Sequence, residues 1–114
     1  MMLLAPVACV CDDEGVSARA ATVKDEVQSS TTVCLYGEIF TMGGTDAVYV
    51  SIIGGTTKEC SDFLTGPRPM YQIGRWYDYV GGLQPNSHYY YRAIAEYPGP
   101  KYYKGLVKEF DTPP

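Results

Sequence analysis

The stretch LQPNSHYYYRAIA, residues 83–95, decides how this 114-residue chain folds. Pro85 and Asn86 are typical of a turn, because proline presets one backbone angle and asparagine tolerates a left-handed conformation. The side chains that follow, over residues 87–97, alternate with a period of two, which predicts a long β-strand. One face carries Tyr89, Tyr91, Ala93 and Ala95, and the other carries His88, Tyr90, Arg92 and Ile94. The stretch therefore describes architecture: a turn that leads into a strand with one buried face.

Short alternating segments separated by glycine and proline occupy the rest of the chain. Twelve glycines and eight prolines supply the breaks between them. Residues 58–74 look like a long irregular connection, with short strands expected near Phe63 and over residues 70–73. Further strands are predicted within residues 17–27, 31–40, 47–53, 76–80 and 102–111. About seven short antiparallel strands with turns between them predict an all-β, immunoglobulin-like sandwich.

Length and charge limit the kinds of protein this chain can be. We expect residues 16–114 to form one domain and residues 1–15 to be an N-terminal extension or an edge strand. The net charge of −4 argues against nucleic-acid binding, which needs clustered lysine and arginine. The apolar start, residues 1–10, is too short to insert across a membrane. Residues 111–114 look like the start of a linker, so we expect neighbouring domains of a longer chain.

The turn before the long strand resembles the E–F corner of fibronectin type III domains, of the kind found in prokaryotic surface proteins. The pattern Leu83-x-Pro85-x-Ser87-x-Tyr89 carries the resemblance. It implies that Leu83 closes the core, that Pro85 fixes the turn, and that the Tyr89 hydroxyl bonds back to upstream backbone. We expect a carbonyl of the crossing loop to be its partner. The resemblance covers roughly residues 16–113.

Two further segments resemble the same family, and three positions depart from it. Residues 35–39 look like strand B, and residues 48–57 look like strand C with its exit. The family often has its tryptophan in strand B, whereas Trp76 precedes the corner here. Prokaryotic relatives often have an aromatic residue where Gly54 stands. Asp78 falls on a nominally inward position, which predicts a bulge or a shifted register before the double glycine that follows.

Four cysteines, at positions 9, 11, 34 and 60, leave three chemical readings open. In a small β domain an even number of cysteines points to disulfides and an oxidising compartment, and four allow three pairings. Cys9 and Cys11 lie on the same side of a strand, so Cys34 and Cys60 are better placed to meet one of them each. Free thiols and a zinc site are the alternatives, although paired C-x-x-C spacing is absent.

No set of residues in the sequence specifies a reaction. His88 is the only histidine, and nothing places a nucleophile and an orienting acid beside it. The acidic run at residues 12–14 lacks the spaced oxygen ligands of a calcium loop and reads as a solvated turn. We therefore expect no enzyme activity, no bound metal and no cofactor.

The tyrosines are the best indication of function. We expect the aromatic side chains around the last hairpin mainly to pack against neighbouring strands, with contact to a protein partner or a glycan as the functional alternative. The candidates are Tyr90, Tyr97, Tyr102 and Tyr103. The sequence predicts a non-catalytic binding or spacer module of an extracytoplasmic, secreted or cell-surface, adhesive or multi-domain protein. The alternative is an accessory sandwich attached to a hydrolase, such as a glycoside hydrolase or a metallophosphoesterase.

Overall fold

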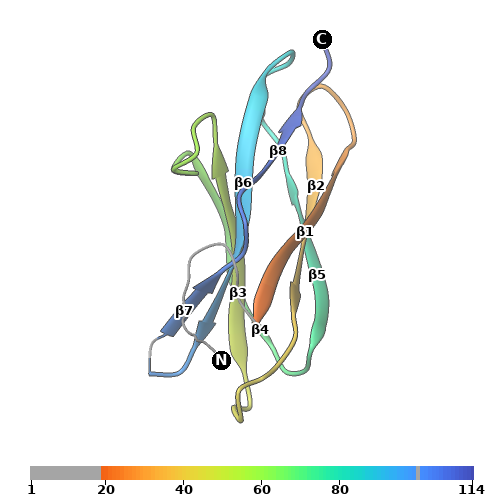
Figure 1. The fold of residues 1–114 in the computed structure, drawn as a ribbon. Helices are drawn as coiled ribbons and strands as arrows, with labels where there is room; N and C mark the ends of the chain where they lie inside the picture. The colour runs from red at the N-terminus through yellow and green to blue at the C-terminus, as the bar shows by residue number, and fades with distance from the viewer. Residues whose placement is uncertain (1–18, 100) are drawn as a thin grey trace, which may run out of the picture.

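Two antiparallel sheets pack face to face in the computed structural model, which describes residues 19–99 and 101–114. Figure 1 shows one layer formed by β3, β4, β6 and β7 and the other formed by β1, β2 and β5. The strands are β1 Ala20–Val27, β2 Val33–Ile39, β3 Val48–Gly55, β4 Phe63–Met70, β5 Gly74–Val80, β6 His88–Tyr97, β7 Lys101–Lys104 and β8 Lys108–Asp111. The predicted all-β sandwich is confirmed.

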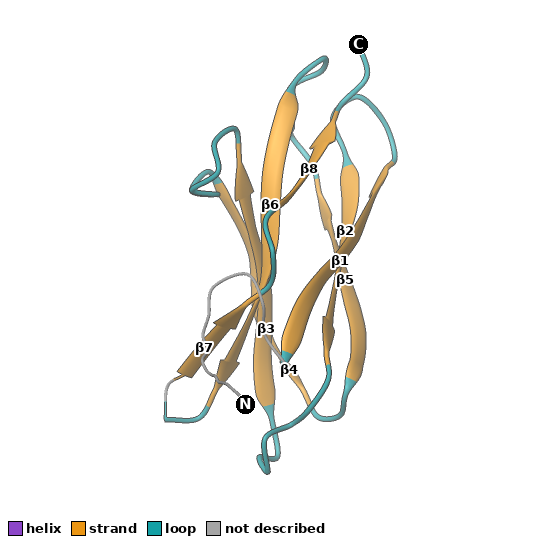
Figure 2. Cartoon of the chain, in the orientation of Figure 1, coloured by secondary structure: helices purple, strands orange, loops and turns teal. Residues whose placement is uncertain are grey.

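Strands and loops account for the whole described chain, as Figure 2 shows. The first sheet has the order β1-β2-β5, and the second has the order β4-β3-β6-β7, with β8 also pairing with β6. Within the described residues no helix is long and apolar enough to cross a membrane. The predicted extension at residues 1–15, which includes Cys9, Cys11 and the acidic run at 12–14, lies outside the described residues.

The core lies between the sheets and is built from the inward side of each alternating strand. In β6 the burial pattern alternates without interruption, as the tyrosine and alanine spacing predicts. Leu35, Ile52 and Tyr91 are among the fully buried side chains. Burying an aliphatic side chain of this size stabilises the fold by about 2 kcal/mol. The facing apolar rows of β2, β3 and β6 therefore hold the two sheets together.

Two departures from the family pattern are compensated within the core. Trp76 enters it from β5 and lies opposite Gly37 of β2, so the large ring takes the space that the glycine leaves. The ring of Phe63, on β4, covers Gly54 of the neighbouring β3, where a Cβ atom would collide with it. An adjacent strand thus supplies an aromatic ring beside Gly54.

The connection between residues 58 and 74 is more regular than predicted. Instead of two short strands, it contains the single eight-residue strand β4, which pairs with β3 on both sides of a bulge. Pro67 and Pro69 lie inside this strand. A proline cannot donate a ladder hydrogen bond, but β4 is at the edge of its sheet, where one side of the backbone needs no partner.

The last predicted strand, within residues 102–111, is divided into β7 and β8, so the described residues form eight strands. Gly105 separates them, because its N–H donates to Ala93 O at 2.9 Å and its Cα lies against Thr22 of β1. The Arg92 guanidinium donates to Gly105 O at 2.8 Å. Alternation in the sequence could not show this break, which depends on the approach of β1 from the opposite sheet.

Asp78 lies inward without the predicted bulge. The pairing of β2 with β5 runs unshifted from Ile39–Gly74 to Val33–Val80. Arg68 Nη1 lies 3.0 Å from Asp78 Oδ1, and the Thr65 hydroxyl donates to Asp78 Oδ2 at 2.9 Å. Both partners come from β4, so Asp78 ties the edges of the two sheets together. The prediction of a bulge or shifted register is wrong. The Asp78 carboxylate can stay inward in regular pairing because Arg68 of the other sheet neutralises it.

The corner around residues 83–89 is closed by hydrogen bonds. Leu83 and Tyr89 are buried, and the Tyr89 hydroxyl accepts a bond of 2.8 Å from the Gln84 amide. The backbone partner of the Tyr89 hydroxyl is thus the N–H of Gln84, within the corner. The prediction that a carbonyl of the crossing loop would be this partner is wrong. Thr112 strengthens the same corner, because its hydroxyl donates to Gln84 O at 2.6 Å and accepts from Ser87 N at 2.9 Å. Pro85 is exposed at the turn.

Candidate functional site

A row of polar aromatic side chains crosses the outer face of the second sheet. Tyr49 of β3 pairs with Glu96 of β6, and Glu96 pairs in turn with Tyr102 of β7. The strand neighbours of Tyr49 and Glu96 are buried, so both side chains point outward, and the register of β6 with β7 places Tyr102 on the same face. We call Tyr49, Glu96 and Tyr102 the tyrosine row.

The tyrosine row is open to solvent. Tyr49 is 47% exposed and Tyr102 is 58% exposed. Among the described residues, Glu96 has no ion pair and no side-chain hydrogen bond. The row therefore presents two aromatic rings on either side of a carboxylate whose acceptor sites are free.

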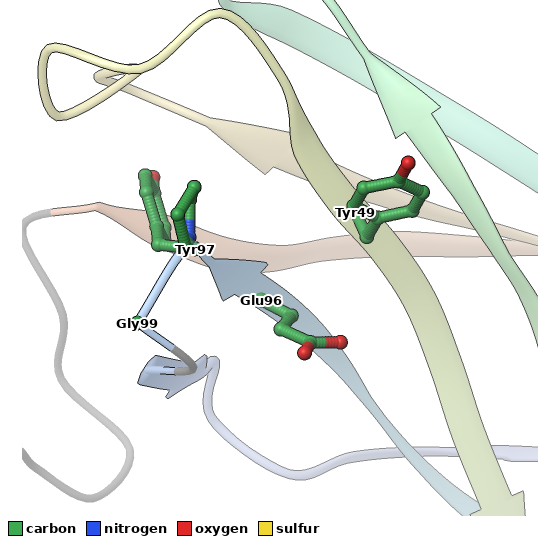
Figure 3. Close-up of a pocket in the computed structure, with 5 residues that line it drawn as sticks. Tyr49, Glu96, Tyr97 and Gly99 are labelled. Atoms are coloured by element: carbon green, nitrogen blue, oxygen red, sulfur yellow. The ribbon is translucent and has the colours of Figure 1, made fainter.

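A hollow of about 290 Å³ lies beside the row at the last hairpin. Its lining residues are Tyr49, Glu96, Tyr97, Pro98 and Gly99. Figure 3 shows Tyr49 on β3 and Glu96 on the neighbouring β6, with Gly99 in the turn beyond. Its lining is mainly apolar and includes one carboxylate, and its volume lies just below the range of about 300–1,000 Å³ found for small-ligand pockets.

The sequence-predicted contact tyrosines fall into different environments. Tyr102 is in the row, but Tyr97 is 4% exposed and belongs to the core, which agrees with the packing role expected for these tyrosines. The Tyr97 hydroxyl donates to Thr41 O at 2.6 Å, and burial raises its pKa. Tyr103 is partly buried and packs edge-on against Tyr97, with a centroid distance of 5.2 Å. The Arg19 guanidinium lies over both rings.

Tyr90, the fourth candidate, lies at the other end of the same outer face. It is half-buried and packs edge-on against the ring of His88. His88 Nδ1 lies 2.5 Å from Asp111 Oδ1, and Nε2 lies 2.6 Å from Glu109 Oε1. The Asp111 and Glu109 carboxylates raise the pKa of His88. This arrangement ties β6 to β8 and leaves neither ring nitrogen free to act as a base.

Cys34 and Cys60 are both buried and are not bonded to each other. Burial raises the pKa of each thiol, so both are protonated near neutral pH. A bond from either to Cys9 or Cys11 stays a prediction, because those partners are outside the described residues. In the part of the chain that the structure describes, no group of histidine, cysteine or acidic side chains is placed to hold a metal ion.

Tyr49 and Glu96 were not among the residues that the sequence singled out. The alternation of residues 47–53 and 87–97 places both on outward faces, which is the signal that could have found them. Their contact depends on the pairing of β3 with β6, about forty residues apart in sequence. Only that register brings them next to Tyr102.

No family model matches the chain, and no curated protein matches it in sequence. Among solved structures, it is similar to the sensor domain of the anti-sigma factor RsgI4 of Pseudobacteroides cellulosolvens. The TM-score is 0.68 at 10% identity, with 82% of this chain and 74% of that chain covered.

Two other solved structures have the same fold. The fibronectin type III domain of human fibronectin type III domain containing protein 3 matches with a TM-score of 0.52 at 16% identity, covering 90% of this chain and 94% of that chain. The structure of PhoD matches with a TM-score of 0.53 at 19% identity, covering 85% of this chain but 19% of that chain. The protein is thus a fibronectin type III-like β-sandwich, as the corner pattern indicated.

Proposed function

We propose that this domain is a non-catalytic binding module of an extracytoplasmic protein, and that the tyrosine row is its binding face. The observation that carries the proposal is the row itself: two exposed aromatic rings flank a carboxylate without a partner, next to a hollow. Exposed tyrosines combine a large apolar surface with a polar tip, which is why they are enriched where proteins bind ligands.

The absence of catalysis is proposed from the state of His88. Both of its ring nitrogens face carboxylates at 2.5 and 2.6 Å, and its nearest aromatic neighbour is Tyr90. Both thiols of the described residues are buried, with raised pKa values. A nucleophile paired with a free base is therefore missing from the described residues.

The extracytoplasmic location is proposed from the similarity to the RsgI4 sensor domain, the highest TM-score among those given above. An epitope tag inserted between Gly43 and Gly44 would test it, because this turn is exposed. An antibody should detect the tag on intact cells that express the complete protein. Detection only after cell lysis would contradict the location, and a tag on a known cytoplasmic protein is the control.

Binding is tested with amide NMR spectra of the chain, titrated with panels of soluble oligosaccharides and of peptides. At least one probe should shift amides clustered at Tyr49, Glu96 and Tyr102. Tyr79→Ala is the matched control, since Tyr79 is 64% exposed on the opposite sheet. If no probe in either panel moves the row, the spacer interpretation replaces the binding module.

An accessory domain of a hydrolase is the second candidate. It is favoured by the match to PhoD, in which a sandwich similar to this one makes up about a fifth of a longer chain. The complete gene distinguishes the two: a hydrolase domain in the same reading frame supports the accessory role. A series of sandwiches with no hydrolase would contradict it.

A further inference from the structure

The tyrosine row has the chemistry of a carbohydrate platform. We propose that it binds a neutral glycan chain, with one sugar ring against Tyr49, another against Tyr102, and hydroxyls between them donating to Glu96. The inference rests on the proposed function, because it names the ligand class of the same face. Aromatic faces pack against the C–H face of a sugar, while a carboxylate accepts hydrogen bonds from its hydroxyls.

The spacing of the strands determines what length of ligand the row fits. Tyr49 and Tyr102 lie on strands that flank β6, so their backbones are about 10 Å apart, or two strand spacings. This separation is wider than a single pyranose ring. An extended oligosaccharide that crosses β6 can occupy both tyrosines at once, whereas a monosaccharide covers only one of them.

Glu96 distinguishes the tyrosine row from the other groups of tyrosines on the two sheets. Carboxylates elsewhere on the sheets are already engaged: Glu38 pairs with Arg75, and Glu109 pairs with His88. On the first sheet, the Tyr36 hydroxyl donates to the Glu26 carboxylate, and the Lys24 ammonium lies over the Tyr36 ring. Among the residues that the structure describes, only the tyrosine row places a carboxylate without an ion pair or side-chain hydrogen bond between two tyrosines.

The size and charge of the site favour a glycan over other partners. A stable protein interface involves about 20–30 residues on each side, whereas five residues line this hollow. Glu96 and the net charge of −4 disfavour anionic ligands. A quaternary ammonium group would also suit tyrosines beside a carboxylate, so the experiment must separate a neutral ligand from a cation.

Isothermal titration of the chain with neutral oligosaccharides of increasing length, and with tetramethylammonium, tests the inference. Affinity should rise until the oligosaccharide spans both rings. Tyr49→Ala and Tyr102→Ala should each weaken binding about tenfold, while Tyr79→Ala leaves it unchanged. Glu96→Gln should bind within about threefold of wild type, because the amide oxygen still accepts, and Glu96→Ala should bind more weakly. The fluorescence of buried Trp76 reports that each variant is folded.

Three results would overturn the glycan assignment. One is that no oligosaccharide binds, and another is that both tyrosine variants bind as wild type. The third is tetramethylammonium binding that Glu96→Gln and added salt abolish, which defines a cation site. If a peptide or an ammonium ligand binds at the row while no glycan does, the domain is still a binding module and only the glycan assignment fails. The failure of the ligand class can thus be told apart from the failure of the proposed function.

Discussion

The fully buried phenol of Tyr91 in β6 donates a hydrogen bond of 2.9 Å to the carboxylate of Asp25 in β1, on the opposite sheet. Burial raises the pKa of Tyr91, and the bond to Asp25 raises it further. The phenol therefore remains a donor throughout the physiological pH range. The bond joins residues 66 positions apart in the sequence and links the two layers of the sandwich.

Tyr91→Phe should lower the free energy of unfolding by about 2 kcal/mol, because a hydrogen bond to a charged group is lost and no new cavity forms. Urea denaturation followed by circular dichroism measures the change. Tyr79→Phe is the control: its ring is 64% exposed, and the change should stay within about 0.5 kcal/mol. A Tyr91→Phe variant as stable as wild type would show that water replaces the phenol at Asp25.

His88 should make stability depend on pH. Its folded pKa is raised above the ordinary value by Asp111 and then Glu109. The stabilisation is therefore fully present below the unfolded pKa of about 6.5 and is lost as pH rises through the higher folded value. Wild type should exceed His88→Gln in stability at about pH 5.5, and the difference should vanish at about pH 9. The measurement is urea denaturation across this range, and an NMR titration of the imidazole gives the midpoint.

A difference between wild type and His88→Gln that grows with pH would contradict this assignment. Asp111→Asn provides the second check, because removing the nearer carboxylate should lower the NMR midpoint of His88. An unchanged midpoint in that variant would mean that the contact does not persist in solution.

Gly105→Ala should destabilise the protein by about 2 to 3 kcal/mol. A Cβ atom at this position would collide with the backbone nitrogen of Thr22, and backbone cannot rotate away as a side chain can. Gly81→Ala is the control, since its Cβ atom would meet only Thr32 Oγ1 at 3.8 Å, an ordinary contact. Thermal unfolding of the two variants should separate them clearly, and equal melting temperatures would refute the proposed close approach.

Thr112→Val should lower the free energy of unfolding by about 2 kcal/mol. The valine keeps the shape but leaves Gln84 O and Ser87 N without their side-chain partner at a site where Thr112 is 3% exposed. Thr112→Ser keeps the hydroxyl and loses one methyl group, so it should be about 1 kcal/mol less stable than wild type. If the two variants are equally stable, the hydroxyl does not hold the corner, and packing of the methyl group does.

The tyrosine row shows where sequence reasoning stops. Tyr102 could be chosen from the sequence because it sits near a hairpin, and alternation correctly places Tyr91 inward. The same alternation also places Tyr97 inward, where it packs in the core, so its position near the hairpin alone did not separate a packing role from a binding role. Tyr49 and Glu96 could not be joined to Tyr102, because a pattern with a period of two fixes a face but not the partner across the sheet.

Local chemistry was sufficient for the architecture of this chain. Turn residues and two-residue alternation depend only on neighbours, so residues 83–97 indicated a corner and a long strand, and the similar segments along the rest of the chain indicated a sandwich. Three features depended on contacts between distant segments: the break at Gly105, the satisfaction of Asp78 by Arg68, and the assembly of the tyrosine row. These follow from strand register and from the approach of one sheet to the other, and only the tertiary structure could decide them.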